Sequence, residues 1–294
     1  VDGCTNEGSV SVASEVACYV GGIAGATNGA NEIALTDCVN SGAVDAYSAN
    51  NASSAGGIVG NLYLGNTGKG LTNSGDIYAG SDASSARAGG IAAVVSMSSA
   101  TAAAQEELLD TANSGTITAK SYNSSYVGGI VGLLQYRGTL SNAKNTGKII
   151  GISTDSGTYT GGLVGSISGS NQREISGGVN EGAVLGQVTL GTAYVGGLVG
   201  SATWMEMDAC VNVGSVAGEY VGQRNGSAYV GGLVGYMAAS AEAAIKRSAS
   251  TGAVSISASG SGSYNAGGAI GRSGATAAQP LIFADNLIAA PISV

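Results

Sequence analysis

The stretch Tyr194-Val-Gly-Gly-Leu-Val-Gly200 decides the fold of this chain, because close copies of it recur along almost all 294 residues. Eight copies of its Gly-Gly dipeptide follow one another in phase, at steps of 35, 33, 39, 33, 35, 35 and 36 residues. The pairs are Gly21-Gly22, Gly56-Gly57, Gly89-Gly90, Gly128-Gly129, Gly161-Gly162, Gly196-Gly197, Gly231-Gly232 and Gly267-Gly268. A period of this size is typical of a stacked-repeat architecture, in which each repeat packs only against its neighbours.

A second mark, Asn-x-Gly, runs in phase with the glycine pairs. Its asparagines are Asn6, Asn40, Asn73, Asn113, Asn145, Asn180 and Asn212. Ser250 takes this place in the eighth copy, and we interpret Asn286 as a degenerate ninth. Stacked amides hydrogen-bond to one another along a solenoid, so we favour an internal asparagine ladder over a row of ligand-binding amides.

Three apolar columns appear when the repeats are aligned on this asparagine. The first alternates large aliphatic and small residues at spacing two, beginning with Val10, Val44, Ile77, Ile117, Ile149, Val184, Val216 and Val254. The second directly follows each glycine pair, at Ile23, Ile58, Ile91, Ile130, Leu163, Leu198, Leu233 and Ala269. The third lies five residues before the asparagine, at Leu35, Gly68, Leu108, Leu140, Ile175, Met207, Ile245 and Leu281, with Leu71 compensating for Gly68. Each column predicts one short strand with an inward face.

Three short strands per repeat describe one coil of a solenoid. We therefore predict an all-β fold, a parallel, right-handed β-solenoid (β-helix) of about eight three-strand coils of roughly 35 residues. The prolines, Pro280 and Pro291, both lie in the last fifteen residues, as expected because a ladder interior cannot accept proline. We assign residues 1–279 to the solenoid and 280–294 to a cap or a junction with a following domain. In the insert at 96–110 of the longest repeat, we expect a short surface helix over 101–109.

Composition limits the partners. Only 10% of the residues are charged and the net charge is −8, so Ser, Thr, Asn and Gly cover the surface, as in many secreted and cell-wall proteins. The few basic residues are scattered, which argues against nucleic acid. No apolar run is long enough to predict membrane insertion in this segment. Because the chain starts at Val1, we expect a fragment, or a mature chain that has lost a signal peptide.

The repeat units resemble the GLUG motif (Gly-Leu-x-Gly). The resemblance is carried by Tyr159-Thr-Gly-Gly-Leu-Val-Gly165, by the matching units at 194–200 and 229–235, and by the Cys-Val-Asn segments at Cys38 and Cys210. It implies an extracellular bacterial cell-surface protein that is adhesin-like, attached to other domains of a longer chain. The zinc peptidase that accompanies this motif in metalloproteases that cleave immunoglobulin A1 is not expected here, because the chain has no His.

Catalytic chemistry has few candidates. The lack of His removes the commonest general base, the Ser-His-Asp arrangement and most zinc sites. The glycine pairs are not read as phosphate loops, because no Lys-Ser/Thr follows them. The acidic candidates are Glu206 with Asp208, Glu106 with Glu107 and Asp110, and Glu174 beside Arg173, all placed in irregular segments where charges are solvated. We predict no enzyme, no cofactor and no metal, and keep a carbohydrate-active β-helix enzyme (polysaccharide lyase- or hydrolase-like) as the alternative.

Tyr126, Tyr159, Tyr194 and Tyr229 hold one repeat position, two residues before the glycine pair. They close connections rich in Tyr, Ser, Asn and Gly, such as 47–54 and 120–126, which we expect to be loops. Tyrosines beside amides and hydroxyls suit the binding of a host glycan or a host protein. The competing interpretation, an aromatic ladder that stabilises a sheet, is favoured.

Two further columns are ambiguous. Val164, Val199 and their equivalents directly follow an inward residue, so they form either an exposed apolar stripe or a second buried column; we favour burial. Cys4 and Cys38 share a position in adjacent repeats and are predicted to stack, as free thiols rather than as a disulfide.

Overall fold

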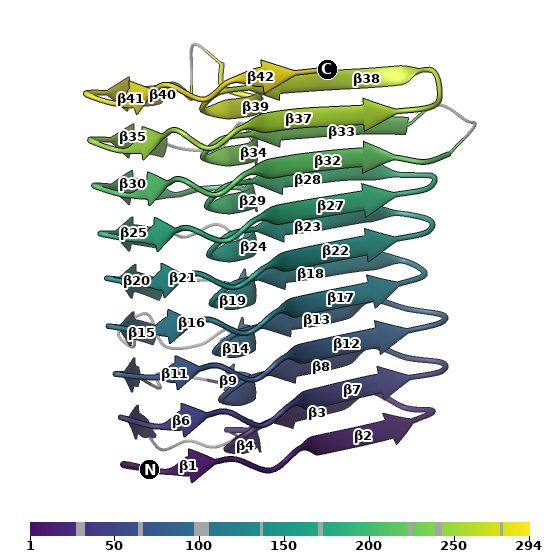
Figure 1. Ribbon diagram of the computed structural model, residues 1–294, viewed down its shortest axis with the longest axis vertical. Coiled ribbons are helices and arrows are strands. Elements are labelled where there is room, and N and C mark those ends of the chain that lie inside the picture. The colour runs from purple at the N-terminus through teal and green to yellow at the C-terminus, as the bar shows by residue number, and fades with distance from the viewer. Residues whose placement is uncertain are drawn as a thin grey trace.

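The computed structural model describes residues 1–27, 33–63, 67–96, 106–135, 138–169, 173–222, 226–238, 243–276 and 279–294. These residues form five parallel sheets that run the length of one solenoid, with the two termini at opposite ends (Figure 1). The chain makes seven full turns between the first and the last strand of each eight-stranded sheet. In Figure 1 the strands labelled β2, β7 and β12 run to the right in front, and the chain returns behind them as it climbs, which makes the coil right-handed.

Each sheet takes its name here from its first strand, and its members are in register. The β1 sheet contains β1 (Thr5–Asn6), β6 (Val39–Asn40), β11 (Thr72–Asn73), β16 (Ala112–Asn113), β21 (Lys144–Asn145), β26 (Val179–Asn180), β31 (Val211–Asn212), β36 (Ala249–Ser250) and β41 (Leu287–Ile288). The β2 sheet contains β2 (Val10–Ser14), β7 (Val44–Ser48), β12 (Ile77–Ser81), β17 (Ile117–Ser121), β22 (Ile149–Ser153), β27 (Val184–Val188), β32 (Val216–Tyr220), β37 (Val254–Ala258) and β42 (Ile292–Ser293). The β3 sheet contains β3 (Cys18–Gly21), β8 (Ser53–Gly56), β13 (Ala86–Gly89), β18 (Ser124–Gly128), β23 (Gly157–Gly161), β28 (Thr192–Gly196), β33 (Gly226–Gly231) and β38 (Gly262–Gly267).

The remaining two sheets close the coil. The β4 sheet contains β4 (Ala24–Ala26), β9 (Val59–Tyr63), β14 (Ala92–Ser96), β19 (Val131–Gln135), β24 (Val164–Ser168), β29 (Val199–Ala202), β34 (Val234–Met237) and β39 (Ile270–Ser273). The β5 sheet contains β5 (Ala34–Thr36), β10 (Thr67–Lys69), β15 (Glu106–Leu109), β20 (Gly138–Ser141), β25 (Arg173–Ser176), β30 (Glu206–Asp208), β35 (Ala243–Lys246) and β40 (Leu281–Ala284).

The predicted parallel β-solenoid is therefore confirmed, but each coil has five strands instead of three. The Asn-x-Gly mark forms a two-residue strand of its own in the β1 sheet, and the residues before each glycine pair form the β3 sheet. The segments at 47–54 and 120–126 are mostly strand, so the expected loops shrink to residues 49–52 and 122–123. Residues 106–109 of the insert form strand β15 and not a helix, because Leu108 stacks between Gly68 and Leu140; the rest of the predicted helix, at 101–105, lies outside the described residues.

The glycine pair is a corner that no side chain can enter. A Cβ atom on Gly161 would lie 2.0 Å from the carbonyl oxygen of Val164, and one on Gly162 would lie 2.1 Å from the carbonyl oxygen of Gly197 in the next coil. The carbonyl of Leu198 accepts hydrogen bonds from both Leu163 and Val164, which bends the chain between these two residues. Glycine is required here because backbone from two coils approaches closely.

This bend decides which way the residues after the glycine pair face. Leu163 and Val164, like Leu198 and Val199, are fully buried although they are consecutive. All four belong to a core enclosed by the β4 and β5 sheets, whereas a second core lies between the β2 and β3 sheets. The expectation of burial is confirmed, and the exposed apolar stripe is excluded.

The asparagine column forms the predicted ladder. Each amide nitrogen donates to the amide oxygen of the next coil over 2.7–2.8 Å, from Asn6 to Asn212. The same nitrogen also donates to the carbonyl of the glycine two residues on, as Asn145 does to Gly147 over 2.9 Å. Because the ladder saturates these amides inside the coil, they are not ligand-binding groups.

The last coil is shifted by two residues from the predicted alignment. Phe283, not Leu281, pairs with Ile245, and Ile288 follows Ser250 in the asparagine column. Asn286 is therefore not a ninth ladder member; its side chain accepts a hydrogen bond from the backbone N–H of Ser248 and donates to the carbonyl of Ile245. Strands β40, β41 and β42 add residues 281–293 to three of the sheets.

A left-handed residue turns the chain between the β5 and β1 sheets in every coil. The residues with positive φ at this corner are Gly3, Asp37, Gly70, Asp110, Asn142, Gly177, Ala209, Arg247 and Asp285, with φ from 48° to 64°. Gly, Asn and Asp adopt this conformation readily, but alanine adopts it at a cost of about 1–2 kcal/mol. Ala209 is therefore a strained corner.

We predict that Ala209→Gly stabilises the protein. The glycine removes the left-handed strain but adds about 0.4–1 kcal/mol of backbone entropy to the unfolded chain, which leaves a net gain of about 0.5–1 kcal/mol. Chemical denaturation of the two proteins measures the difference. The control is Ala217→Gly on strand β32, which carries no positive φ and should lose about 0.5–1 kcal/mol. A destabilised Ala209→Gly variant would contradict the strain.

Candidate functional site

The four tyrosines selected from the sequence lie on strands, not on loops. Tyr126, Tyr159, Tyr194 and Tyr229 occupy one register position of the β3 sheet. The ring centroids of Tyr126 and Tyr159 lie 4.7 Å apart with the planes 6° from parallel, and those of Tyr159 and Tyr194 lie 4.9 Å apart at 14°. Tyr194 and Tyr229 lie 5.7 Å apart at 57°. The structure thus brings all four together as one tyrosine ladder.

Cations cover both ends of the tyrosine ladder. The guanidinium carbon of Arg87 lies 5.9 Å from the centroid of Tyr126, and that of Arg272 lies 4.9 Å from the centroid of Tyr229. Arg272 also donates a hydrogen bond to the hydroxyl of Tyr229. Tyr236, from the β4 sheet, packs against Tyr194 and Tyr229 with centroid distances of 5.5 and 6.0 Å.

This arrangement leaves little ring face for a ligand. Each ring of the stack rests on a neighbouring ring or cation, which supports the structural role and leaves ring edges and hydroxyls as the contact surface. Arg87 holds the same repeat position as the tyrosines, one coil earlier. Its contact with Tyr126 could therefore have been predicted from the sequence alignment of the repeats. Arg272 and Tyr236 come from the β4 sheet, and no sequence repeat pointed to them.

The stacked rings give a pH-dependent contribution to stability. Burial, followed by the neighbouring Tyr126 and Tyr194, raises the pKa of Tyr159 well above its ordinary value of 10.0. A raised pKa means that the folded state favours the neutral phenol, so this contribution is complete below about pH 10 and is lost as the pH rises above it. We expect the free energy of unfolding to fall above pH 10, and to fall less steeply in Tyr159→Phe. Denaturant titrations of both proteins between pH 8 and 11.5 give the two slopes, and identical slopes would contradict the assignment.

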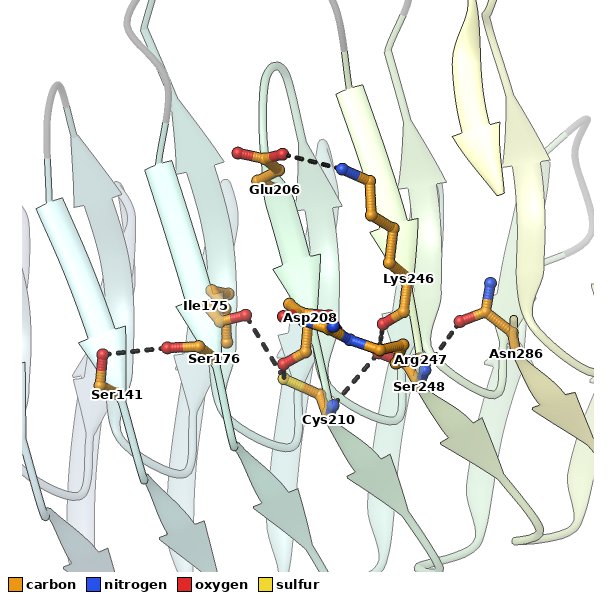
Figure 2. A network of polar contacts seen from close by, with 10 residues as sticks. All are labelled: Ser141, Ile175, Ser176, Glu206, Asp208, Cys210, Lys246, Arg247, Ser248 and Asn286. Atoms are coloured by element: carbon orange, nitrogen blue, oxygen red, sulfur yellow. Dashed lines mark hydrogen bonds and ion pairs between the residues drawn. The ribbon is translucent and has the colours of Figure 1, made fainter. Parts of the chain in front are cut away.

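The acidic candidates lie on the β5 sheet and are partly neutralised. Lys246 and Glu206 form an ion pair of 3.3 Å, and Arg247 pairs with Asp208 through its Nε at 2.8 Å and through Nη2 (Figure 2). The hydrogen bond that the Asp208 carboxylate accepts from Arg247 lowers the pKa of Asp208. These pairs are exposed, so each adds at most about 1 kcal/mol to stability.

One pair of carboxylates meets the first requirement of the enzyme alternative. Glu174 and Glu206 are register partners on neighbouring strands, contrary to the expected irregular segment, and they line a hollow of about 320 Å³ with Asp208, Lys246 and Asp285. Glu107 lies on strand β15, and Asp110 accepts a hydrogen bond from Asn142 in the left-handed corner. The side chain of Glu106 lies outside the described residues.

The four cysteines are free thiols in different surroundings. Cys4 is exposed, whereas Cys38 and Cys210 are buried in the β4–β5 core. Cys4 and Cys38 stack as predicted, each directly before a paired residue of β1 and β6. Burial raises the pKa of Cys210 to about 11, and the thiol bonds to the carbonyls of Ile175 and Asp208, so it stays protonated at neutral pH. Within the described ranges, no group of three or more Cys, Asp or Glu side chains could hold a metal ion, and no helix is long and apolar enough to cross a membrane.

Comparison with known protein families identifies a GLUG motif at residues 123–150, which extend from the turn after β17 to the start of β22 and include Tyr126 and the corner at Gly128-Gly129. Searches of curated proteins and of solved structures gave no significant match. The chain is therefore a parallel β-solenoid in which residues 123–150 match the GLUG motif.

Proposed function

We propose that this chain is an extracellular module of a bacterial surface protein, adhesin-like, in which a stiff solenoid presents the face of the β3 and β4 sheets to a host glycan or protein. The observation that carries the proposal is the tyrosine ladder, which among the described residues is the one aromatic row that continues through four coils on a single face. Its ring edges and hydroxyls form a regular row of hydrogen-bonding groups along the long axis.

Other features support a surface location. The GLUG motif resembles segments of bacterial surface proteins, and the exposed surface relies on Ser, Thr, Asn and Gly with only 10% charged residues. Stability comes from stacked ladders that need no cofactor. The partner therefore meets a preformed face, which lowers the entropy cost of binding.

The test compares binding before and after removal of the ladder hydroxyls. The purified protein is screened on immobilised glycans and host matrix proteins, and the hit is measured again with the triple variant Tyr126→Phe, Tyr159→Phe, Tyr194→Phe. Phenylalanine keeps the stack and removes three hydroxyls, each worth about 1 kcal/mol, so affinity should fall at least tenfold. Tyr78→Phe on the β2 sheet is the matched control. Unchanged affinity of the triple variant would exclude the ladder as the binding face.

A second candidate function, cleavage of a polysaccharide by a carbohydrate-active enzyme, is favoured by the juxtaposition of Glu174 and Glu206. A pair of carboxylates is the minimum for glycoside hydrolysis, and these two line one hollow. Incubation with acidic and neutral polysaccharides, using Glu174→Gln as the comparison, tests it. Release of reducing ends by the parent protein, and its loss in the variant, would replace the binding proposal with an enzyme.

A further inference from the structure

The tyrosine position of the β3 sheet changes character in the first coils. Tyr19, Ser54 and Arg87 are register partners there, directly before Tyr126. Parallel strands in register direct such partners to the same face, so a short serine stands between two long side chains. The ladder thus lacks one rung at Ser54. The hydroxyl of Ser54 is buried and has no hydrogen-bond partner among the described residues.

A hollow is lined by Tyr19 and Arg87, the two register neighbours of Ser54. It has a volume of about 320 Å³, and the polar part of its lining comes from Tyr19, Asn61, Tyr63, Arg87, Ser96 and Gln135. Two aliphatic side chains of β14 and β19 complete the wall. Small-ligand sites are clefts of about 300–1,000 Å³, so this mostly polar hollow is large enough for a small polar ligand.

The chemistry of the hollow points to a carboxylated ring. Arg87 is the one charged side chain in the described lining, in a protein with a net charge of −8, so the hollow is a local cationic point on an acidic molecule. Stacking on Tyr126 holds its guanidinium in place. A planar guanidinium fixed in this way binds a carboxylate through two parallel hydrogen bonds.

The remaining groups suit sugar hydroxyls. The hydroxyl of Ser96 donates to the side-chain oxygen of Asn61 over 2.9 Å, which orients that amide and leaves its NH₂ group to donate. Gln135 adds a second amide, and the phenol ring of Tyr19 is 46% exposed at the rim. Amides for hydroxyls and an aromatic surface for the C–H face of a ring favour a sugar over an acidic peptide side chain, which needs neither.

We propose that this hollow binds the carboxylated unit of a glycan, a uronic acid or a sialic acid, with Arg87 on the carboxylate and Asn61, Ser96 and Gln135 on the hydroxyls. The proposal rests on the proposed function in taking a glycan as the partner. It adds the identity of the recognised unit and the place where it binds, at the end of the tyrosine ladder that lies nearest the N-terminus.

Isothermal titration with defined sugars tests it. The probes are 3′-sialyllactose, an oligosaccharide of hyaluronan (the uronic acid arm), lactose and N-acetylglutamate. One or both acidic sugars should bind saturably and at least tenfold more tightly than lactose and N-acetylglutamate, and the arm that binds identifies the source of the carboxylate. In Arg87→Gln the affinity should fall at least tenfold, to the level of lactose. Lys120→Gln, on the outer face of the β2 sheet, is the matched control for loss of one positive charge and should bind as the parent protein does.

A second variant keeps the test decisive if Arg87→Gln loosens the ladder. Ser96→Leu removes the hydroxyl that orients Asn61 and places a larger side chain in the lining of the hollow, so it should lower the affinity at least tenfold while leaving Arg87 and the ladder in place. Equal affinity of the parent and Arg87→Gln, preference for N-acetylglutamate, or no saturable binding of either acidic sugar would overturn the proposal. Failure of the proposed function looks different, because then no glycan on the screen binds the parent protein or responds to the triple tyrosine variant.

Discussion

Asn145→Ala is expected to lower the free energy of unfolding by about 3–5 kcal/mol. Asn145 is fully buried in the middle of the asparagine ladder. Its amide oxygen accepts from Asn113 over 2.8 Å, and its nitrogen donates to Asn180 over 2.8 Å and to the carbonyl of Gly147. The same amide oxygen accepts from the backbone N–H of Gly147, so alanine removes the partner of two donors and two acceptors in a place that water does not reach, and each group left unpaired costs about 1–3 kcal/mol.

The position within the ladder provides the control. Asn6 makes the same two donor contacts in the first coil but is only partly buried, so water replaces the lost partners. Asn6→Ala should therefore cost about 1 kcal/mol or less. Urea denaturation of both variants gives the comparison. Equal losses at the two positions would mean that the ladder contributes through strand pairing alone.

Gly147→Ala is expected to destabilise the protein by about 3 kcal/mol or more, or to prevent folding. The added Cβ would lie 2.0 Å from the carbonyl oxygen of Gly115 in the preceding coil. That oxygen lies in the bend between β16 and β17 and accepts a hydrogen bond from the amide of Asn113, so it cannot move away without disturbing the ladder. Overpacking of this kind exceeds the usual 1–3 kcal/mol because no side-chain rotation relieves it.

Gly8 is the same repeat position in the first coil, where no coil precedes it. The nearest atom to a Cβ on Gly8 is a side-chain oxygen at 3.8 Å, an ordinary contact. Gly8→Ala should leave stability within about 0.5 kcal/mol of the parent. The melting temperatures of the two variants decide the matter, and a tolerated Gly147→Ala would show that adjacent coils are packed less closely than in this structure.

The sequence predicts those features of the structure that recur in every coil. The period, the asparagine ladder, the compensation of Gly68 by Leu71 and the burial of Val164 and Val199 follow from residues that recur at one position. The number of strands per coil could not be predicted, because a two-residue strand such as β6 is too short to show an alternation of buried and exposed residues. The left-handed corner was hidden for a different reason: Ala209 and Arg247 interrupt an otherwise recognisable column of Gly, Asp and Asn.

Features that join different sheets could not be predicted from the repeat. The stacking of Tyr236 on Tyr194, and the cover that Arg272 gives to Tyr229, depend on how far the coil turns between the β3 and β4 sheets. The shift of two residues in the last coil could not be predicted, because Leu281 and Asn286 fit the repeat pattern in a register that the structure does not adopt. The hollow beside Arg87 is lined by residues of the β3 and β4 sheets that do not recur at one repeat position, so the repeat could not reveal it.

The placement of the termini at opposite ends of the stack has a mechanical consequence. A pull between Val1 and Val294 acts along the inter-strand hydrogen bonds, so it loads the rungs of one coil at a time instead of shearing whole sheets. We expect stepwise peeling from the ends at low force, in a force–extension trace with regular teeth. Each detached repeat of about 35 residues would lengthen the tether by roughly 120 Å, at about 3.4 Å per extended residue. A single cooperative rupture would contradict this, whereas regular teeth would make the solenoid an extensible tether that dissipates load applied between its two ends.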